Sequence, residues 1–169
     1  DLNTDIGSYG AAVRTPHLDR LAARGVRFDR AYTQYPLCSP SRSSFLTGRR
    51  PNVTGVLTNP GRNPLSPHFR ERIPATVTMP QLFKQHGWFA ARVGKLFHYG
   101  VPLDIGTGSL DDHHSWDLAI NPRGRDRDGL DRVFSLVPGQ YGGTLSWLAD
   151  QGSDAEQTDG IGAADALAY

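Results

Sequence analysis

Apolar and polar residues occur with two periodicities along the first part of the chain, and each periodicity predicts one kind of secondary structure. Apolar residues at helical spacing over 16–24 predict a helix, with Thr15 as its N-cap and Gly25 as its stop. Alternation of apolar and polar residues over 26–32 predicts a strand. A second helix is expected over about 39–46, because its Ser and Pro residues are typical of a first helical turn.

Helices and strands continue to alternate along the rest of the chain. The pattern predicts, in order, a loop over 51–75, a helix over 78–86, a strand over 88–93, a largely irregular stretch over 99–143, a short strand over 145–149 and a helix over 159–169. This order indicates an α/β layered fold with a largely parallel sheet. Ligands of such sheets lie beyond the carboxyl ends of the strands. Cys38 and Lys95 both follow a predicted strand, so we expect them at one end of the sheet.

Composition narrows the class of protein. The 169 residues, 38% of them hydrophobic and 21% charged, are enough for one globular domain with a core. A net charge of +1 and the lack of a basic patch disfavour a nucleic-acid binder. No run approaches the ~18 apolar residues of a membrane span, and no signal peptide is found. The single cysteine excludes an internal disulfide.

That cysteine, Cys38, lies where the second predicted helix begins, and its neighbours favour chemistry over a packing role. Free backbone N–H groups and the dipole at a helix N-terminus favour an anion. Arg42 lies four residues further on and therefore shares a helix face with Cys38. A nucleophile, a positive helix end and a guanidinium together suit a tetrahedral oxyanion such as sulfate or phosphate. The alternative is a buried structural cysteine beside a surface arginine.

A second group of candidate residues follows the strand predicted over 88–93. Lys95 and His98 are three residues apart in the segment 94–98. The lysine is suited to pair with a sulfate oxygen, and the histidine to exchange a proton near neutral pH. Taken alone, these residues are equally explained by a solvated lysine and a histidine that packs beside Phe97.

Together, the two segments resemble a known family. Residues 38–49 resemble the sulfatase signature, C-x-P-x-R followed by a T-G-R turn. A phosphotyrosine-phosphatase loop also joins a cysteine to an arginine, but it needs the arginine six places on, where this chain has Ser44. Residues 94–98 are similar to the sulfatase lysine–histidine motif, with the spacing and the preceding Phe of the iduronate-2-sulfatase-like branch. Supporting similarity to that branch is found over 15–21, 112–116 and 154–160.

The resemblance implies an alkaline-phosphatase-like α/β/α sandwich with a mostly parallel central sheet. Because the chain opens on Asp1 without a preceding strand and ends within a helical pattern, we expect 1–169 to be the N-terminal portion of a single sulfatase catalytic domain. Residues 99–143 would form a largely irregular insertion in it. The sequence itself leaves the compartment open, and the family resemblance implies a periplasmic, secreted or lysosome-like location.

The resemblance also implies a modified residue and a metal ion. A maturation enzyme that generates formylglycine would oxidise Cys38 to 3-oxoalanine. One calcium ion would be bound by Asp1 and Cys38, since residues 1–3 match the end of a D-D-L-N segment whose two aspartates bind calcium in the family. We therefore expect an Asp immediately before Asp1.

The activity implied is that of a sulfuric ester hydrolase, which cleaves a sulfate ester, expected to be that of a sulfated sugar, through the formylglycine hydrate. Arg42 would hold the geminal diol, Lys95 would neutralise a sulfate oxygen, and His98 would exchange a proton with the second hydroxyl. The family's later metal pair and second lysine would lie beyond Tyr169, so the 169 residues are expected to hold part of the site.

Two other functions stay open on the sequence. A phosphodiesterase or phosphonate monoester hydrolase of the same fold would act on a similar tetrahedral anion. A non-catalytic module that binds a sulfated glycan would need Arg42 and Lys95 but not the cysteine chemistry. Residues 111–114, two aspartates and two histidines, either bind a metal or lie in a solvated loop near the substrate's sugar.

Overall fold

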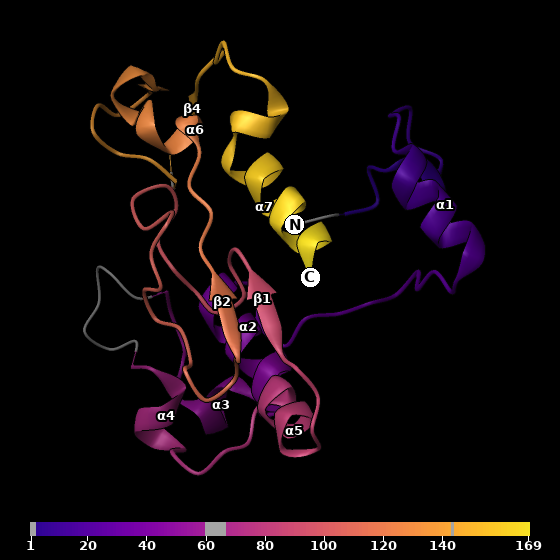
Figure 1. The fold of residues 1–169 in the computed structure, drawn as a ribbon, viewed down its shortest axis with the longest axis vertical. Helices are drawn as coiled ribbons and strands as arrows, with labels where there is room; N and C mark the ends of the chain where they lie inside the picture. The colour runs from indigo at the N-terminus through magenta and orange to yellow at the C-terminus, as the bar shows by residue number, and fades with distance from the viewer. Residues whose placement is uncertain (1–2, 60–66, 143) are drawn as a thin grey trace. The chain divides into compact units, whose positions relative to one another are not determined.

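The computed structural model describes residues 3–59, 67–142 and 144–169 of the chain. The chain divides into two compact units, Asp1–Thr33 and Gln34–Tyr169 (Figure 1). Asp1, the expected calcium ligand, lies outside the described residues. Among the described helices, none is both long enough and apolar enough to cross a membrane.

The first unit contains a short 3₁₀ helix, η1 (Gly7–Tyr9), and the helix α1 (Pro16–Arg24). α1 confirms the helix predicted over 16–24. Thr15 occupies the N-cap position without capping the helix. Its hydroxyl instead accepts a hydrogen bond from the Gly7 N–H (2.9 Å) and donates one to Asp19 Oδ1 (2.9 Å). The threonine therefore ties η1 to α1.

The strand predicted over 26–32 is wrong: the structure has an irregular segment there. The apolar residues of the alternating pattern, Val26 and Phe28, are 80% and 71% exposed. Alternation marks a face that can be buried, but a strand also needs a neighbouring strand to accept and donate its ladder hydrogen bonds. No described strand pairs with this segment. Cys38 thus follows an irregular segment and not a strand.

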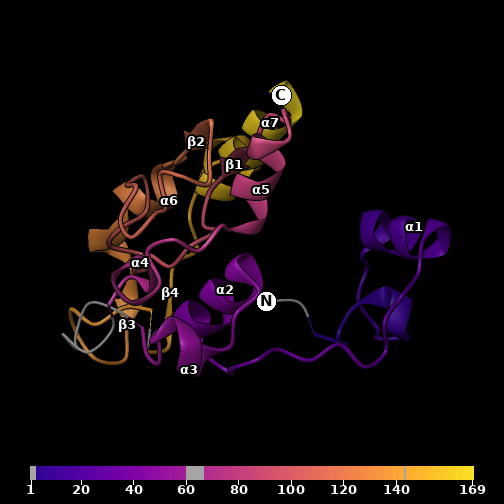
Figure 2. The same cartoon turned by 90° about the horizontal axis from the view of Figure 1, so that it is seen from below.

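The second unit holds most of the secondary structure. Its longer helices and helical turns are α2 (Cys38–Thr47), α3 (Pro51–Thr54), α4 (Phe69–Arg72), α5 (Met79–Gln85), α6 (Arg125–Asp128), η2 (Leu130–Arg132), η3 (Asp154–Glu156) and α7 (Thr158–Ala168). Its strands are β1 (Ala91–Val93), β2 (Leu118–Ile120), β3 (Phe134–Ser135) and β4 (Ser146–Trp147). α2 and α3 are consecutive helices that lie next to each other (Figure 2).

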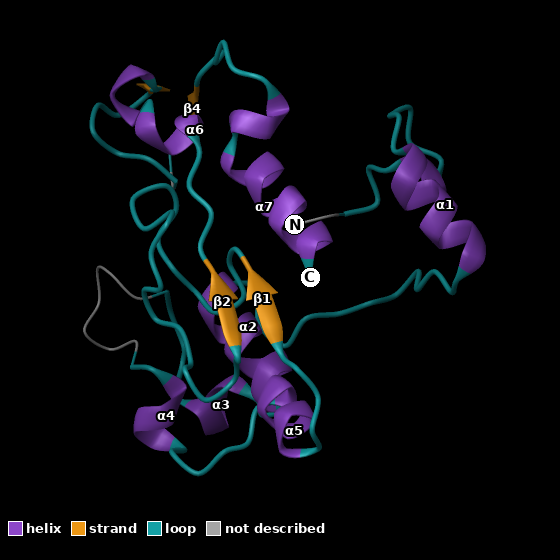
Figure 3. Cartoon of the chain, in the orientation of Figure 1, coloured by secondary structure: helices purple, strands orange, loops and turns teal. Residues whose placement is uncertain are grey.

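The strands form two small sheets (Figure 3). β1 and β2 are parallel, with Ala91 opposite Leu118, whereas β3 and β4 are antiparallel. The described residues therefore form an α/β structure with a small parallel sheet, which agrees with the expected α/β class. The helices predicted over 39–46, 78–86 and 159–169 are confirmed, as are short strands within 88–93 and 145–149.

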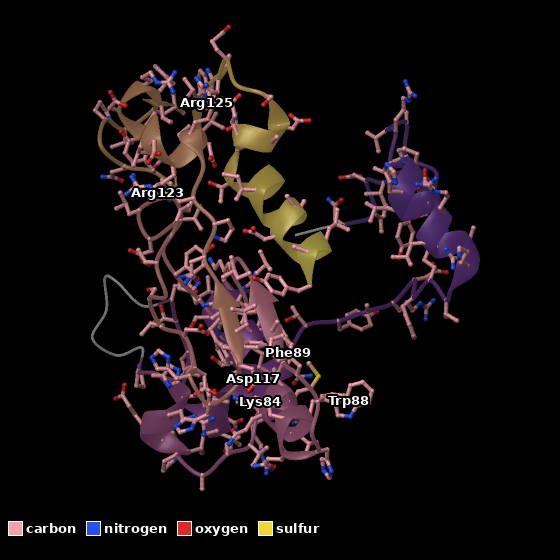
Figure 4. All side chains as sticks on the ribbon, viewed as in Figure 1. Lys84, Trp88, Phe89, Asp117, Arg123 and Arg125 are labelled. Carbon is pink, nitrogen blue, oxygen red and sulfur yellow. The ribbon has the colours of Figure 1, made fainter. Side chains whose placement is uncertain are left out.

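Three features of the second unit differ from the prediction. The stretch over 99–143 contains β2, whose three apolar residues are too short a run to predict a strand. β1 begins only at Ala91, where its pairing with β2 starts. Trp88 and Phe89 before it are each 66% exposed, and Trp88 points away from the ribbon (Figure 4). The loop predicted over 51–75 includes two single-turn helices, and its residues 60–66 lie outside the described part of the chain.

A hydrophobic core holds the segment after β1 against the helices. It contains Leu46 of α2, Val56, Phe69 of α4 and Phe97, each no more than 5% exposed. The rings of Phe69 and Phe97 stack with centroids 5.6 Å apart, an arrangement that adds stability beyond the area buried. Because Leu96 packs on the same core, the residues between Lys95 and His98 are anchored by burial.

Local capping and ion pairing attach α5 to the parallel sheet. Thr78 caps α5 by accepting from the Gln81 N–H, and its buried hydroxyl also bonds to Ser115 Oγ at 2.6 Å. Lys84 donates to the Trp116 carbonyl (2.9 Å) and lies 3.3 Å from Asp117, which it faces in Figure 4. α5 is thus bound to the segment that leads into β2.

A buried ion pair joins α4 to the same segment. Arg70 Nε donates to Asp112 Oδ1 at 2.7 Å and Arg70 Nη2 to Asp112 Oδ2 at 2.8 Å. The Asp112 side chain is 2% exposed. Burial by itself would raise the pKa of Asp112, but the hydrogen bonds from Arg70 and Ser115 outweigh it and hold the pKa below its usual range.

We predict that Asp112→Asn lowers the free energy of unfolding by about 3 kcal/mol, because it leaves the Arg70 charge without its partner in a mostly buried position. The matched control is Asp128→Asn, which breaks the exposed pair with Arg123 (labelled in Figure 4) and should cost less than about 1 kcal/mol. Denaturant unfolding of both variants at neutral pH makes the measurement. Equal losses of stability would contradict the prediction.

Candidate active site

Cys38 is the first residue of α2, and its side chain is exposed. This position excludes a buried structural cysteine and confirms the predicted helix start. The helix end offers fewer backbone donors than we expected, however. The Ser39 N–H donates to Asn59 Oδ1 at 2.9 Å, and Pro40 has no N–H. Attraction of an anion to this end of α2 therefore depends mainly on the helix dipole and on neighbouring cationic side chains.

Arg42 joins the two sequence motifs. Its Nη1 donates to the carbonyl of Lys95 at 2.8 Å and to the carbonyl of Leu96 at 2.9 Å. Neither of these bonds uses Nε or Nη2. This contact places α2 beside the loop that carries Lys95. The expectation that Cys38 and Lys95 meet as the ends of two strands is wrong, because no described strand precedes Cys38.

The side chain of Lys95 is partly buried and not fully solvated. Burial lowers the pKa of its ammonium, the nearby Cys38 opposes that change, and the charge of Arg42 adds to it. Its Nζ lies over the ring of Tyr99, 5.4 Å from the centroid, which is a cation–π contact. A partly desolvated ammonium interacts more strongly with an anion than a solvated one does.

His98 is buried, with 9% of its surface exposed, and no described residue hydrogen-bonds to its buried Nδ1. Burial, followed by the charges of Lys95 and Arg42, lowers the pKa of His98 to about 4, while Asp104 opposes the change. His98 is therefore neutral at neutral pH. At neutral pH it can accept a hydrogen bond, and it takes up a proton only when a nearby anion raises its pKa.

This shift predicts a pH dependence of stability. The folded pKa of His98 is about 4 and the unfolded value is 6.5, so the unfolded chain binds more protons between these values and stability falls as pH drops through this window. His98→Gln removes the titration, and its unfolding free energy should fall less over the same window. The same substitution at the exposed His113 is the matched control. Equal pH dependence in His98→Gln and the wild type would contradict the prediction.

The described residues do not form a calcium site by themselves. They include no group of three or more His, Cys, Asp or Glu side chains that could hold a metal ion. Asp111 and Asp112, one of the candidate clusters in the sequence, each accept hydrogen bonds from an arginine, and His113 and His114 beside them are exposed. The segment 111–114 therefore stabilises the fold, in a loop whose histidines are solvated.

Sequence reasoning missed two residues that border the site. Asn59, which binds the Ser39 N–H, lies in the proline-rich stretch where no pattern distinguishes it. Tyr99 directly follows His98, and burial raises the pKa of its hydroxyl while its ring faces Lys95. An aromatic residue next to a lysine–histidine pair was the available signal for Tyr99.

The chain is also similar in sequence to known proteins of one family. A family model described as Sulfatase matches residues 1–138. Iduronate 2-sulfatase from Mus musculus is 39% identical over 120 residues, which cover 70% of this chain and 20% of that protein. A protein named Sulfatase from Formosa agariphila is 34% identical over 165 residues, 94% of this chain and 32% of its own length. The chain thus spans between a fifth and a third of these relatives.

Proposed function

The chain belongs to the sulfatase family, and we propose that the intact protein hydrolyses sulfate esters, with a sulfated sugar as the expected substrate class. The observation that supports this most is the pair of hydrogen bonds from Arg42 to the carbonyls of Lys95 and Leu96. They bring an exposed cysteine at a positive helix end together with a partly buried lysine and a neutral histidine. Three groups suited to a sulfate ester therefore share one region.

We propose that a formylglycine-generating enzyme oxidises Cys38 to 3-oxoalanine. Once hydrated, this aldehyde would supply one hydroxyl that attacks the sulfur of the ester and breaks the bond from sulfur to the alcohol, which leaves with a proton. Deprotonation of the second hydroxyl would then break the carbon–oxygen bond to the sulfate, release sulfate and restore the aldehyde. The exposure of Cys38 at the start of α2 supports this assignment, because substrate has to reach the reacting atom. The positive end of the helix dipole favours the negative charge that develops on this side chain.

The other roles follow from the environment of each group. Lys95 would bind an anionic sulfate oxygen, and its partial desolvation strengthens that interaction. Arg42 would add positive charge beside Cys38 while its Nη1 holds the loop that carries Lys95. His98, neutral and with an unpartnered Nδ1 among the described residues, would accept a proton or a hydrogen bond from the diol.

We also propose that one calcium ion is bound by Asp1 and by residue 38 in the intact protein. Because the described residues do not complete a calcium site, the remaining ligands have to come from the rest of the protein. In the same way, residues 1–169 would be the N-terminal portion of a single catalytic domain with an alkaline-phosphatase-like α/β/α sandwich.

Hydrolysis assays with the intact protein, produced together with the maturation enzyme, test the proposal. We expect turnover of an aryl sulfate, no comparable turnover of an aryl phosphodiester or phosphonate monoester, and 3-oxoalanine in the peptide that spans Cys38 by mass spectrometry. Preferential hydrolysis of the phosphorus esters would favour a phosphodiesterase. Binding of a sulfated glycan without turnover of any ester would favour a non-catalytic module.

A further inference from the structure

Three successive backbone carbonyls in the site loop are bound by arginines. The Gly94 carbonyl accepts from Arg92 Nη1 at 2.8 Å, and the next two, those of Lys95 and Leu96, accept from Arg42 Nη1. Hydrogen bonds from charged donors are stronger than those between neutral groups. The loop between β1 and His98 is therefore fixed by two guanidinium groups, one from α2 and one from β1.

Arg92 is the one of these two arginines that no sequence motif includes. It is the central residue of β1 and is 5% exposed. Besides the Gly94 carbonyl, its Nη1 donates to Asn121 Oδ1 at 2.9 Å and to the Ile120 carbonyl at 3.3 Å. Because the Gly94 N–H also donates to Ile120 (2.9 Å), Arg92 binds both sides of the point where the loop leaves the sheet.

The charge of Arg92 is compensated by Asp111, whose own position is fixed. Arg92 Nε donates to Asp111 Oδ2 at 2.7 Å, and its Nη2 contacts the same oxygen. Asp111 Oδ1 accepts from Trp116 Nε1 and from the Asp112 N–H, both at 2.9 Å. With 3% and 7% of the two side chains exposed, removal of either partner would leave a buried charge.

We propose that Arg92, held by Asp111, is a positioning residue for Lys95 and His98; this inference rests on the proposed function. Gly94 has a φ of +69°, a left-handed conformation that lets the chain turn sharply where it leaves β1. The carbonyl that follows this turn is the one that Arg92 binds. The guanidinium therefore sets the direction in which the loop approaches α2. Lysine could not replace it, because an ammonium lacks the planar fork that reaches Asp111 and the carbonyls together.

The chain provides a matched control in the adjacent pair Arg70–Asp112. It too is a buried pair in which an arginine fork binds a carboxylate and backbone carbonyls, here those of Pro74 and Thr76. Those carbonyls are remote in sequence from both site motifs. Arg92→Lys and Arg70→Lys therefore remove comparable interactions and keep the net charge. Only the first removes a hydrogen bond to the loop that carries Lys95.

The first measurement is steady-state hydrolysis of an aryl sulfate by the intact, matured protein, corrected for the folded fraction. Arg92→Lys is expected to lower kcat by about 10- to 100-fold with a smaller change in KM, because displacement of a catalytic group by about 1 Å carries a cost of this size. Arg70→Lys should keep kcat close to that of the wild type. An unchanged kcat in Arg92→Lys, or an equal loss in both variants, would overturn the proposal.

The second measurement does not need turnover. Acylation of Lys95, read by mass spectrometry relative to Lys84, should rise in Arg92→Lys and stay unchanged in Arg70→Lys. If the wild type hydrolyses no sulfate ester, the proposed function is wrong. If Lys95 is acylated equally in the wild type and in both variants, the positioning role of Arg92 is wrong. If Arg92→Lys does not fold, Asp111→Asn replaces it, and wild-type acylation of Lys95 in that variant overturns the inference.

Discussion

Cys38→Ala is expected to lower kcat for sulfate ester hydrolysis by on the order of 10⁴- to 10⁶-fold, the range seen when an enzyme loses its nucleophile. The variant has no side chain that can be oxidised or attack sulfur. Stability should change little, because Cys38 is an exposed first-turn residue and alanine favours a helix. Aryl sulfate turnover and thermal unfolding of the intact protein, measured side by side, separate the two effects.

Cys38→Ser sharpens this prediction. A serine hydroxyl can attack the sulfur and release the alcohol, but the resulting sulfate ester has no second hydroxyl on the same carbon to expel the sulfate. We expect one turnover at most and a sulfated peptide 38 in the mass spectrum. The control is wild-type protein produced without the maturation enzyme, which should keep a thiol and be inactive. Full activity of that thiol form, or of Cys38→Ala, would refute the proposed chemistry.

The elements that the sequence predicts correctly are those whose signals are local. α5 is specified by Thr78 and Gln81, whose reciprocal capping bonds involve residues three apart. α2 is specified by a first-turn Pro and by Gly48, which has a φ of +66° and ends the helix. In both helices the residues that determine the boundaries lie within one turn of them, so the pattern contains the needed information.

The failed predictions involve partners that are distant in the sequence. Residues 26–32 alternate as a strand would, yet they pair with no described strand. β2 has only three residues. It forms a strand because it pairs with β1, which lies more than twenty residues earlier in the chain. A single sequence shows the alternation of a strand but not whether a partner exists.

The candidate site divides in the same way. Cys38, Arg42, Lys95 and His98 could be selected because their spacing matches a motif. Arg92 and Asn59 could not, because each acts by binding a backbone group, and the sequence does not show where a backbone carbonyl or N–H will lie. The burial of His98, which moves its pKa away from neutrality, is likewise a property of the packing around Phe97 and not of the motif.

Arg42→Met is expected to lower kcat by on the order of 10³-fold, as the loss of a group that stabilises developing negative charge does. Methionine keeps much of the apolar stem but removes the positive charge beside Cys38 and Lys95. It also leaves the carbonyls of Lys95 and Leu96 without the donor that holds their loop to α2. Position and charge are lost together, so we expect a larger effect than for Arg92→Lys, which displaces the loop and leaves Arg42 in place.

A change in titration distinguishes this account from simple loss of stability. The Arg42 charge contributes to lowering the pKa of both Lys95 and His98, so Arg42→Met should raise both pKa values. Arg42→Lys restores the charge but not the two-carbonyl contact, and it should recover the wild-type pKa of His98 with only part of the activity. Arg50→Met, an exposed site just beyond α2, is the matched control and should leave both unchanged. NMR titration of His98 measures these shifts. A His98 pKa that does not change in Arg42→Met would contradict an effect of the Arg42 charge on His98.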